Sequence, residues 1–333
     1  MTTFSVSLPS GKTFTAEEGV SLIDAAAAAG VNLPYSCKTG RCSTCKCQLL
    51  SGTSRALDEE TGLSGEEQAA GWILGCVRTP MSDILLDVED LDGVQLPAQK
   101  TLPCRIDTIE KRVDDVLEIL LRLPPTADFR FLAGQYIEVI GPGGVRRSYS
   151  LAGADRGGNK LEIHVRQVEG GVMSRYWFEQ AKANDLLRLH GPLGTFFLRK
   201  TAGRDLVFLA TGTGIAPIKA MLDSMSELPA EQLPRSVHVL WGGRRIQDLY
   251  FDVAAPRLPL TFTPVLSRRV PEWAGALGYV QDVYLSAQPV LDQVTVYACG
   301  SDAMIGSAKK ALIAAGLPER QFLSDAFVCS STR

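Results

Sequence analysis

Three kinds of hydrophobic pattern follow one another along this chain, and each predicts a different architecture. Up to about residue 92, short alternating runs and a helical period are mixed, with a Pro9-Ser10-Gly11 turn between the first two runs. The expected strands are residues 3–8, 13–15, 46–50 and 83–89, and the expected helices are residues 20–29 and an acidic stretch at 58–70. This region therefore predicts a small mixed α+β domain.

The pattern then changes twice. From residue 101 to about 200, short strands such as QYIEVI, RRSYSLA and LEIHVRQV are separated by turn residues, which is typical of an antiparallel barrel. From residue 205 onward, apolar strands such as DLVFLA and VTVYACG alternate with helical patterns such as IKAMLDSMSEL. This alternation predicts an α/β region built on a largely parallel sheet.

These changes divide the chain into three expected domains. A length of 333 residues suits two or three domains, and DGVQLPAQK has the glycine, proline and polar residues of a linker. The expected bounds are 1–92 for the first domain, 93–100 for the linker, 101–200 for the barrel and 201–333 for the α/β domain.

Charge is unevenly distributed between these regions. Residues 1–92 hold 6 Lys and Arg against 13 Asp and Glu, a net −7, whereas residues 93–333 hold 28 against 24, a net +4. This distribution argues against a nucleic-acid partner. No apolar run reaches the roughly 18 residues of a membrane span. The opening MTTFSVSLPSGK has no signal-peptide pattern, so we expect a cytoplasmic protein.

Four cysteines carry the most specific signal in the sequence. The spacing is Cys37-x4-Cys42-x2-Cys45, and Cys76 follows after thirty further residues. This is the plant-type arrangement of the ligands of a [2Fe–2S] cluster, which needs four converging thiolates. A zinc ribbon would need a second C-x2-C pair, and a disulfide is less expected in a reducing compartment. Cys47 is expected to be a small buried residue.

The strand RRSYS carries residue types that suit a flavin. Arg147 offers a fork of donors for a pyrophosphate, Tyr149 can pack against a flat ring, and the Ser150 hydroxyl can bind a ring nitrogen. A glycine turn downstream opens a helix, whose N-terminus suits a phosphate. The further candidates for this site are His164, Val165, Arg166, Gly171, Val172, Met173 and Ser174.

The segment DLVFLATGTGIAP reads as strand, glycine turn and helix. Its Gly-x-Gly lets the backbone approach a dinucleotide pyrophosphate, although Pro217 stands where a third glycine is usual. The candidates here are Thr211, Gly212, Thr213, Gly214 and Pro217 in the turn, Cys299 and Gly300 at the end of a later strand, and Gly242 and Arg244 where an adenosine ribose is expected. The arginines of WGGRR would also suit the 2′-phosphate of NADPH.

In this order, the three blocks resemble a plant-type [2Fe–2S] ferredoxin fused to a ferredoxin–NADP reductase-like flavoprotein, and the resemblance covers the whole chain. RSYS is similar to the family's Arg-x-Tyr-Ser flavin motif, and TGTGIAP to its nicotinamide pyrophosphate loop. The resemblance implies a multi-domain α+β, β and α/β fold: a β-grasp ferredoxin domain, an antiparallel β-barrel FAD domain and a parallel-sheet nucleotide-binding domain. The implied cofactors are a [2Fe–2S] cluster, FAD and NADH, with NADPH possible.

The resemblance also implies an activity and three catalytic residues. Ser150 is expected near the flavin N5, Cys299 beside the nicotinamide, and Phe327 over the flavin ring. Electrons would pass from NADH through FAD and the cluster to an electron-acceptor protein.

Finer matches favour one family of reductases over others. LRLPPTADFRFLAGQYIEVI, GPLGTFFLR and LSDAFV resemble the CDP-6-deoxy-Δ3,4-glucoseen reductases of 3,6-dideoxyhexose biosynthesis, which implies a dehydrase as the acceptor. The alternatives are the reductase component of a ring-hydroxylating oxygenase, with a terminal oxygenase as acceptor, or a general NADH:flavin or NADH:acceptor reductase. A non-catalytic electron carrier or zinc-binding module is disfavoured by the flavin and nicotinamide blocks.

Overall fold

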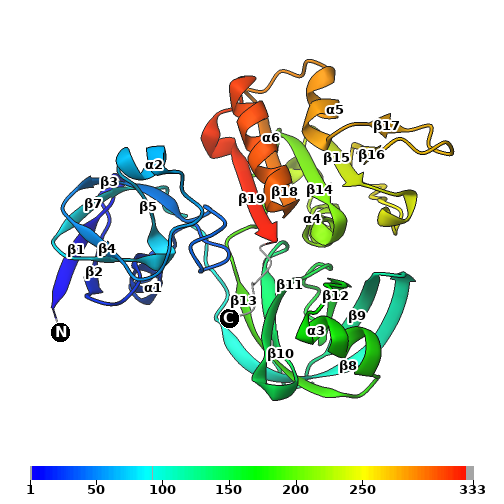
Figure 1. Cartoon of the computed structure of the whole chain (residues 1–333), viewed down its shortest axis with the longest axis horizontal. Coiled ribbons are helices and arrows are strands. Elements are labelled where there is room, and N and C mark those ends of the chain that lie inside the picture. The colour runs from blue at the N-terminus through cyan, green and yellow to red at the C-terminus, as the bar shows by residue number, and fades with distance from the viewer. Residues whose placement is uncertain (1, 92, 328–333) are drawn as a thin grey trace. The chain divides into compact units, whose positions relative to one another are not determined.

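The computed structural model describes residues 2–91 and 93–327. The chain forms two compact units, one containing the described residues up to Leu96 and the other spanning Pro97–Phe327 (Figure 1). Among the described residues, none of the helices combines the length and the apolar composition that crossing a bilayer requires. The last residues of the sequence, including Val328 of LSDAFV, lie outside the described part.

The first unit is a mixed five-stranded sheet with one main helix, which confirms the predicted α+β class of this region. Its strand order is β2-β1-β7-β3-β5, and β1 pairs with β7 in parallel. The strands are β1 (Thr3–Ser7), β2 (Thr13–Glu17), β3 (Lys46–Ser51), β5 (Trp72–Leu74) and β7 (Ile84–Asp87). Helix α1 (Leu22–Ala28) begins where the Ser21 side chain accepts a hydrogen bond from the Asp24 amide. Its apolar face joins the core beneath the sheet.

The expected helix at 58–70 is much shorter in the structure. Only α2 (Gly65–Ala69) is helical, and it begins at a capping box formed by Ser64 and Glu67. The preceding residues are held as a turn because the Glu60 carboxylate accepts the Leu74 amide at 2.7 Å. A small sheet of β4 (Ser54–Ala56) and β6 (Arg78–Pro80) was also missed by the hydrophobic pattern, because both strands are only three residues long.

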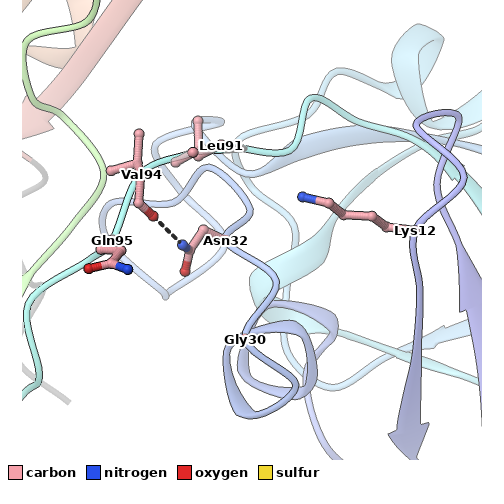
Figure 2. A pocket seen from close by; sticks show the side chains of 7 residues that line it. Lys12, Gly30, Asn32, Leu91, Val94 and Gln95 are labelled. Carbon is pink, nitrogen blue, oxygen red and sulfur yellow. Dashed lines mark hydrogen bonds between the residues drawn. The ribbon is translucent and has the colours of Figure 1, made fainter.

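The end of the first unit is tied back to its own body. The Leu91 amide donates to the Asn32 carbonyl at 2.8 Å. Asn32 Nδ2 donates to the Val94 carbonyl at 2.9 Å (Figure 2). These bonds lie beside a surface pocket of about 230 Å³. The pocket is lined by Lys12, Gly30, Asn32, Leu91, Gly93, Val94 and Gln95, none of which is a predicted site residue.

The second unit begins with the predicted antiparallel barrel. Six strands pair in the order β11-β10-β13-β8-β9-β12, and a bridge between Leu151 and Ile163 joins the two outer strands and closes the barrel. The strands are β8 (Lys100–Val113), β9 (Val116–Arg122), β10 (Tyr136–Ile140), β11 (Arg146–Ser150), β12 (Lys160–Arg166) and β13 (Leu186–Leu193). The short helix α3 (Val172–Arg175) follows β12 and contributes Met173 to the barrel core.

The rest of the second unit is the predicted parallel sheet. All six strands run parallel in the order β17-β16-β15-β14-β18-β19. The strands are β14 (Asp205–Thr211), β15 (Ser236–Gly243), β16 (Leu260–Leu266), β17 (Ala276–Leu277), β18 (Val294–Ser301) and β19 (Phe322–Phe327), and the helices are α4 (Ile215–Ser226), α5 (Val280–Ser286) and α6 (Asp302–Ala314).

The central strand of that sheet marks the expected ligand site. β14 lies between β15 and β18, so the direction of winding reverses on either side of it. In open α/β sheets, ligands bind beyond the carboxyl ends of the strands at such a reversal. The antiparallel barrel and the parallel sheet confirm the predicted fold class for these two regions.

Candidate functional site

The cysteine loop takes a conformation that few sequences allow. Lys38, Gly40 and Ser43 all have positive φ angles, of 55°, 72° and 58°. A Cβ atom at Gly40 would overlap the Glu59 carbonyl oxygen, so only glycine fits against that segment. The tight loop brings three cysteines together within nine positions, and Cys76 lies in a short helical turn (Gly75–Val77) after β5.

The four predicted ligands are arranged as two pairs. The side chains of Cys37 and Cys42 interact with each other, as do those of Cys45 and Cys76, and the Cys37 amide donates to Cys42 Sγ at 3.5 Å. The bond from Cys42, helped by the amides of Thr39 and Arg41, lowers the pKa of Cys37, and the bond from Cys45 lowers the pKa of Cys76. The same contacts raise the pKa of Cys42 and of Cys45, so each pair favours one thiolate, which is the form that binds metal.

This paired arrangement fits a [2Fe–2S] cluster better than a zinc ion. Tetrahedral zinc with bonds of about 2.3 Å would hold its four sulfur atoms about 3.8 Å apart. Among the described residues, no three cysteine sulfur atoms all lie within 4.8 Å of one another. Two irons, each held by one pair, would suit this spacing.

Cys47 lies beside the loop without joining it. Its side chain is buried in the core of the first unit, and burial raises its pKa to about 12. A thiol that resists deprotonation is a poor metal ligand. The structure thus places Cys47 as the buried residue that the sequence suggests.

On the barrel, Arg147 and Tyr149 lie on one face of β11, and Ser150 lies on the opposite face. Both are half-buried, and the charge of Arg147 acts on the Tyr149 hydroxyl. Ser150 is buried, and its hydroxyl has no hydrogen-bond partner within the described ranges, so it remains available to a ligand. Next to β11, the turn at Gly141 packs against Met173 so closely that a Cβ atom there would overlap its sulfur. The start of α3 therefore lies beside the turn that precedes β11.

The structure places the other candidate residues of the flavin block in several different environments. The Val165 and Met173 side chains are in the barrel core, so only their main chains could face a ligand. Ser174 Oγ accepts the Val168 amide at 2.8 Å, and Val172 is exposed. His164 is buried with both ring nitrogens near protein partners, Tyr250 Oη at 2.8 Å and Glu162 Oε1 at 3.0 Å.

Arg166 faces the nucleotide loop instead of the barrel interior. Its guanidinium bonds Asp115 at 3.2 Å and Asp248 at 2.9 Å. A Cβ atom at Gly212 would lie 2.7 Å from Arg166 Nη1. The structure therefore brings a barrel strand to the first glycine of the predicted pyrophosphate loop.

The two nicotinamide blocks meet at the carboxyl edge of the sheet. β14 and β18 are paired, with Ala210 opposite Cys299. A Cβ atom at Gly214 would overlap the Cys299 carbonyl oxygen, and one at Gly300 would overlap Thr211 Oγ1. Gly300 also has a φ of 141°. Glycine is thus needed on both sides of this contact, and Pro217 follows in the first turn of α4.

Sequence reasoning missed two residues that support this edge. Asp325 on β19 is buried directly opposite Cys299, and Trp241 Nε1 on β15 donates to the Gly212 carbonyl at 3.0 Å. Both depend on strand pairing, which no local spacing reveals. Burial and then the nearby Asp325 charge raise the pKa of Cys299, so its thiol stays protonated. Phe327 ends β19 opposite Ser301 and is partly exposed.

The loop after β15 is fixed by a buried carboxylate. Asp248 Oδ2 accepts the amides of Arg244 and Arg245 at 2.8 and 3.1 Å. Burial opposes ionisation of Asp248, but these amides and the neighbouring arginine charges lower its pKa below the usual value. The Arg245 side chain is paired with Asp248, whereas Arg244 is exposed beyond Gly242.

Comparison with known families covers each of these sites. Residues 6–81 match the 2Fe-2S iron-sulfur cluster binding domain, residues 103–198 the oxidoreductase FAD-binding domain, and residues 208–310 the oxidoreductase NAD-binding domain. These matches confirm the predicted cofactors, a [2Fe–2S] cluster, FAD and NAD(H).

Individual relatives share this whole arrangement. A CDP-6-deoxy-L-threo-D-glycero-4-hexulose-3-dehydrase reductase of Yersinia pestis is 42% identical over 97% of both chains. The reductase component 1 of a terephthalate 1,2-dioxygenase from Comamonas sp. is 31% identical over 96% of this chain and 95% of its own. The crystal structure of the Amycolatopsis cytochrome P450 reductase GcoB aligns with a TM-score of 0.76 and 32% identity, covering 98% of this chain and all of that one.

Proposed function

Because this chain belongs to the iron–sulfur flavoprotein reductases that join a [2Fe–2S] domain to FAD- and NAD-binding domains, we propose that it reduces a dehydrase acting on a CDP-linked 6-deoxyhexulose. The oxidoreductase class and the cofactors follow from the family. The identity of the electron acceptor is the part that we propose.

One observation carries this choice of acceptor. The Yersinia dehydrase reductase is 42% identical across nearly the full length of both chains, whereas the dioxygenase reductase is 31% identical over a similar length. All three domains are shared with both relatives, so the extra identity cannot come from a missing or added domain. The higher identity therefore supports a dehydrase as the electron acceptor.

We also propose roles for the site residues. The cluster ligands are Cys37, Cys42, Cys45 and Cys76; the FAD residues are Arg147, Tyr149, Ser150 and the residues at the start of α3; and the NADH residues are Thr211–Gly214, Pro217, Gly242, Cys299 and Gly300. When bound, FAD accepts a hydride from NADH and the cluster carries electrons singly.

The chain's part is to hold these groups in place. The amides at the start of α4 can donate to the pyrophosphate of NADH. The protonated Cys299 thiol and the Ser150 hydroxyl are neutral donors suited to orienting the two rings. Phe327 is exposed enough to cover a ring of the flavin.

We propose NADH as the reductant, because the loop after β15 offers little positive charge to the extra 2′-phosphate of NADPH. Arg245 is already paired with Asp248 and Asp115, so of the two arginines in this loop Arg244 is the one left to bind a 2′-phosphate. Steady-state kcat/KM with NADH and with NADPH decides this point, and Arg244→Ala should lower only the value for NADPH.

The acceptor is tested with purified components. The protein is mixed with NADH, a CDP-6-deoxyhexulose dehydrase and its CDP-sugar substrate under anaerobic conditions. NADH oxidation that requires both dehydrase and sugar supports the proposal. If NADH reduces the protein's own cluster but the electrons pass to a terminal oxygenase and not to the dehydrase, the dioxygenase-reductase alternative is favoured.

A further inference from the structure

Trp177 makes a hydrogen bond that none of the proposed roles explains. Its ring is buried, and its Nε1–H donates to Tyr149 Oη at 2.9 Å. The two rings meet edge to face, with centroids 6.1 Å apart and planes at 83°. A buried indole needs one acceptor, and here that acceptor is the hydroxyl of a proposed FAD residue.

The helix that carries Trp177 is locally irregular. Tyr176–Gln180 form a π-helical turn that continues α3, closed by the Ala181 amide donating to the Tyr176 carbonyl at 2.8 Å. Single π turns change which side chains face a neighbouring element and are frequent at functional sites. The same segment starts at Gly171, so it contributes to two parts of the proposed FAD site.

The chemistry of a phenol gives this bond a direction. A tyrosine hydroxyl has one proton and two lone pairs, whereas an indole can only donate. Trp177 therefore occupies an acceptor position and leaves the Tyr149 proton unused. Within the described part of the chain, no hydrogen bond from that proton is present. Burial raises the pKa of Tyr149 to about 12, so the proton is retained at neutral pH.

We propose that Trp177 is a positioning residue for FAD, which fixes the Tyr149 hydroxyl as a hydrogen-bond donor toward an oxygen of the cofactor. Both the phosphate and the ribityl chain of FAD offer such oxygens. Arg147 lies on the same face of β11, so a cation and an oriented donor point to the same anionic or hydroxylated ligand. This inference rests on the proposed role of Tyr149 in holding FAD.

The test is a double-mutant cycle on FAD affinity. Dissociation constants are measured by flavin fluorescence on deflavinated protein carrying Trp177→Phe, Tyr149→Phe, both or neither. Trp177→Phe should weaken binding about three- to tenfold, which is the loss of one hydrogen bond. In the Tyr149→Phe background, it should add less than about a twofold change, because the acceptor is already gone.

A purely structural role gives another result. If Trp177→Phe weakens FAD binding equally in both backgrounds, or not at all, the proposal is overturned. Trp273→Phe is the matched control, because it removes an indole N–H bonded to the Ala276 carbonyl at 2.9 Å in the nucleotide domain. It should leave FAD affinity unchanged. FAD binding by the unsubstituted protein tests the proposed function separately.

A second measurement leaves Trp177 intact, in case its substitution prevents folding. The chain has four tryptophans, so the indole N–H region of a proton–nitrogen spectrum is simple. Tyr149→Phe should shift one indole proton upfield, as expected for an N–H that has lost its acceptor. Four unmoved indole signals would show that the bond is not formed in solution and would overturn the proposal.

Discussion

The cysteine loop and the carboxyl edge of the parallel sheet are both proposed cofactor sites, but they are assembled from very different parts of the chain. The loop takes Cys37, Cys42 and Cys45 from one short stretch whose backbone is forced into positive φ angles. The edge joins Gly214 to Cys299 through the pairing of β14 with β18. One site is local in sequence, and the other exists only after the sheet has formed.

Because of this difference, we expect the two sites to respond differently to single substitutions. In the proposed site each of the four cysteines would bind iron, so the loss of one ligand should remove the whole group. At the sheet edge, binding is spread over several backbone and side-chain contacts, each contributing modestly. We therefore expect all-or-none effects at the loop and graded effects at the edge.

The largest effect is expected for Cys45→Ser. The variant should lose most of its iron and its reduced-cluster signal, because one of the four thiolates expected to hold the cluster is gone. Reduction of FAD by NADH should stay normal, since its residues lie in the other compact unit. Iron analysis, electron paramagnetic resonance and stopped-flow absorbance measure these properties.

Cys47→Ala is the matched control for that experiment. Cys47 is a buried, protonated thiol two positions away, and its removal should leave the cluster intact. An intact cluster spectrum in Cys45→Ser, or a lost one in Cys47→Ala, would contradict the ligand assignment.

The next largest effect is expected for Gly214→Ala at the sheet edge. The new methyl group would overlap the Cys299 carbonyl oxygen, and main-chain atoms on both sides leave little room to relax. Overpacking of this kind costs about 1–3 kcal/mol. We expect NADH binding, measured by stopped-flow reduction over a range of NADH concentrations, to weaken about tenfold or more.

The matched control is Gly306→Ala in α6. No atom lies within 4 Å of the Cβ position there, so the same methyl group meets no neighbour. Alanine in a helix should stabilise the protein by up to about 1 kcal/mol without changing NADH binding. Equal loss of NADH binding in both variants would show that the effect of Gly214→Ala is not specific to its contact with Cys299.

The same contrast explains what the sequence could predict. Cys37-x4-Cys42-x2-Cys45 specifies its chemistry by spacing, and the strands of the barrel and sheet follow from their apolar runs. Asp325 and Trp241 could not be found in this way, because their roles depend on which strands become neighbours. The short strands β4 and β6 were missed for another reason: three residues are too few to show an alternating hydrophobic pattern.

A smaller effect is expected for Cys299→Ala. The variant should bind FAD normally and reduce it about tenfold more slowly at saturating NADH, since the hydrogen bond proposed from this thiol to the reacting rings would be lost. Because burial raises the pKa of Cys299, the thiol stays neutral, and the wild-type reduction rate should not change between pH 7 and 9 on its account. A normal stopped-flow rate of flavin reduction in the variant would contradict the proposed role of Cys299.

The smallest effect is expected for Thr211→Val, which keeps the side-chain shape and removes one hydroxyl. Thr211 Oγ1 accepts the Ser301 amide at 3.2 Å, and Gly300 packs directly against it. Ser301 is exposed, so water can replace the lost acceptor, and KM for NADH should rise only about two- to fivefold with kcat unchanged. Thr263→Val on β16 is the control, because its hydroxyl pairs with His238 within the sheet and not at its edge. A large fall in kcat for Thr211→Val would mean that this hydroxyl touches the reacting groups, and the edge would then resemble the cysteine loop in depending on a single side chain.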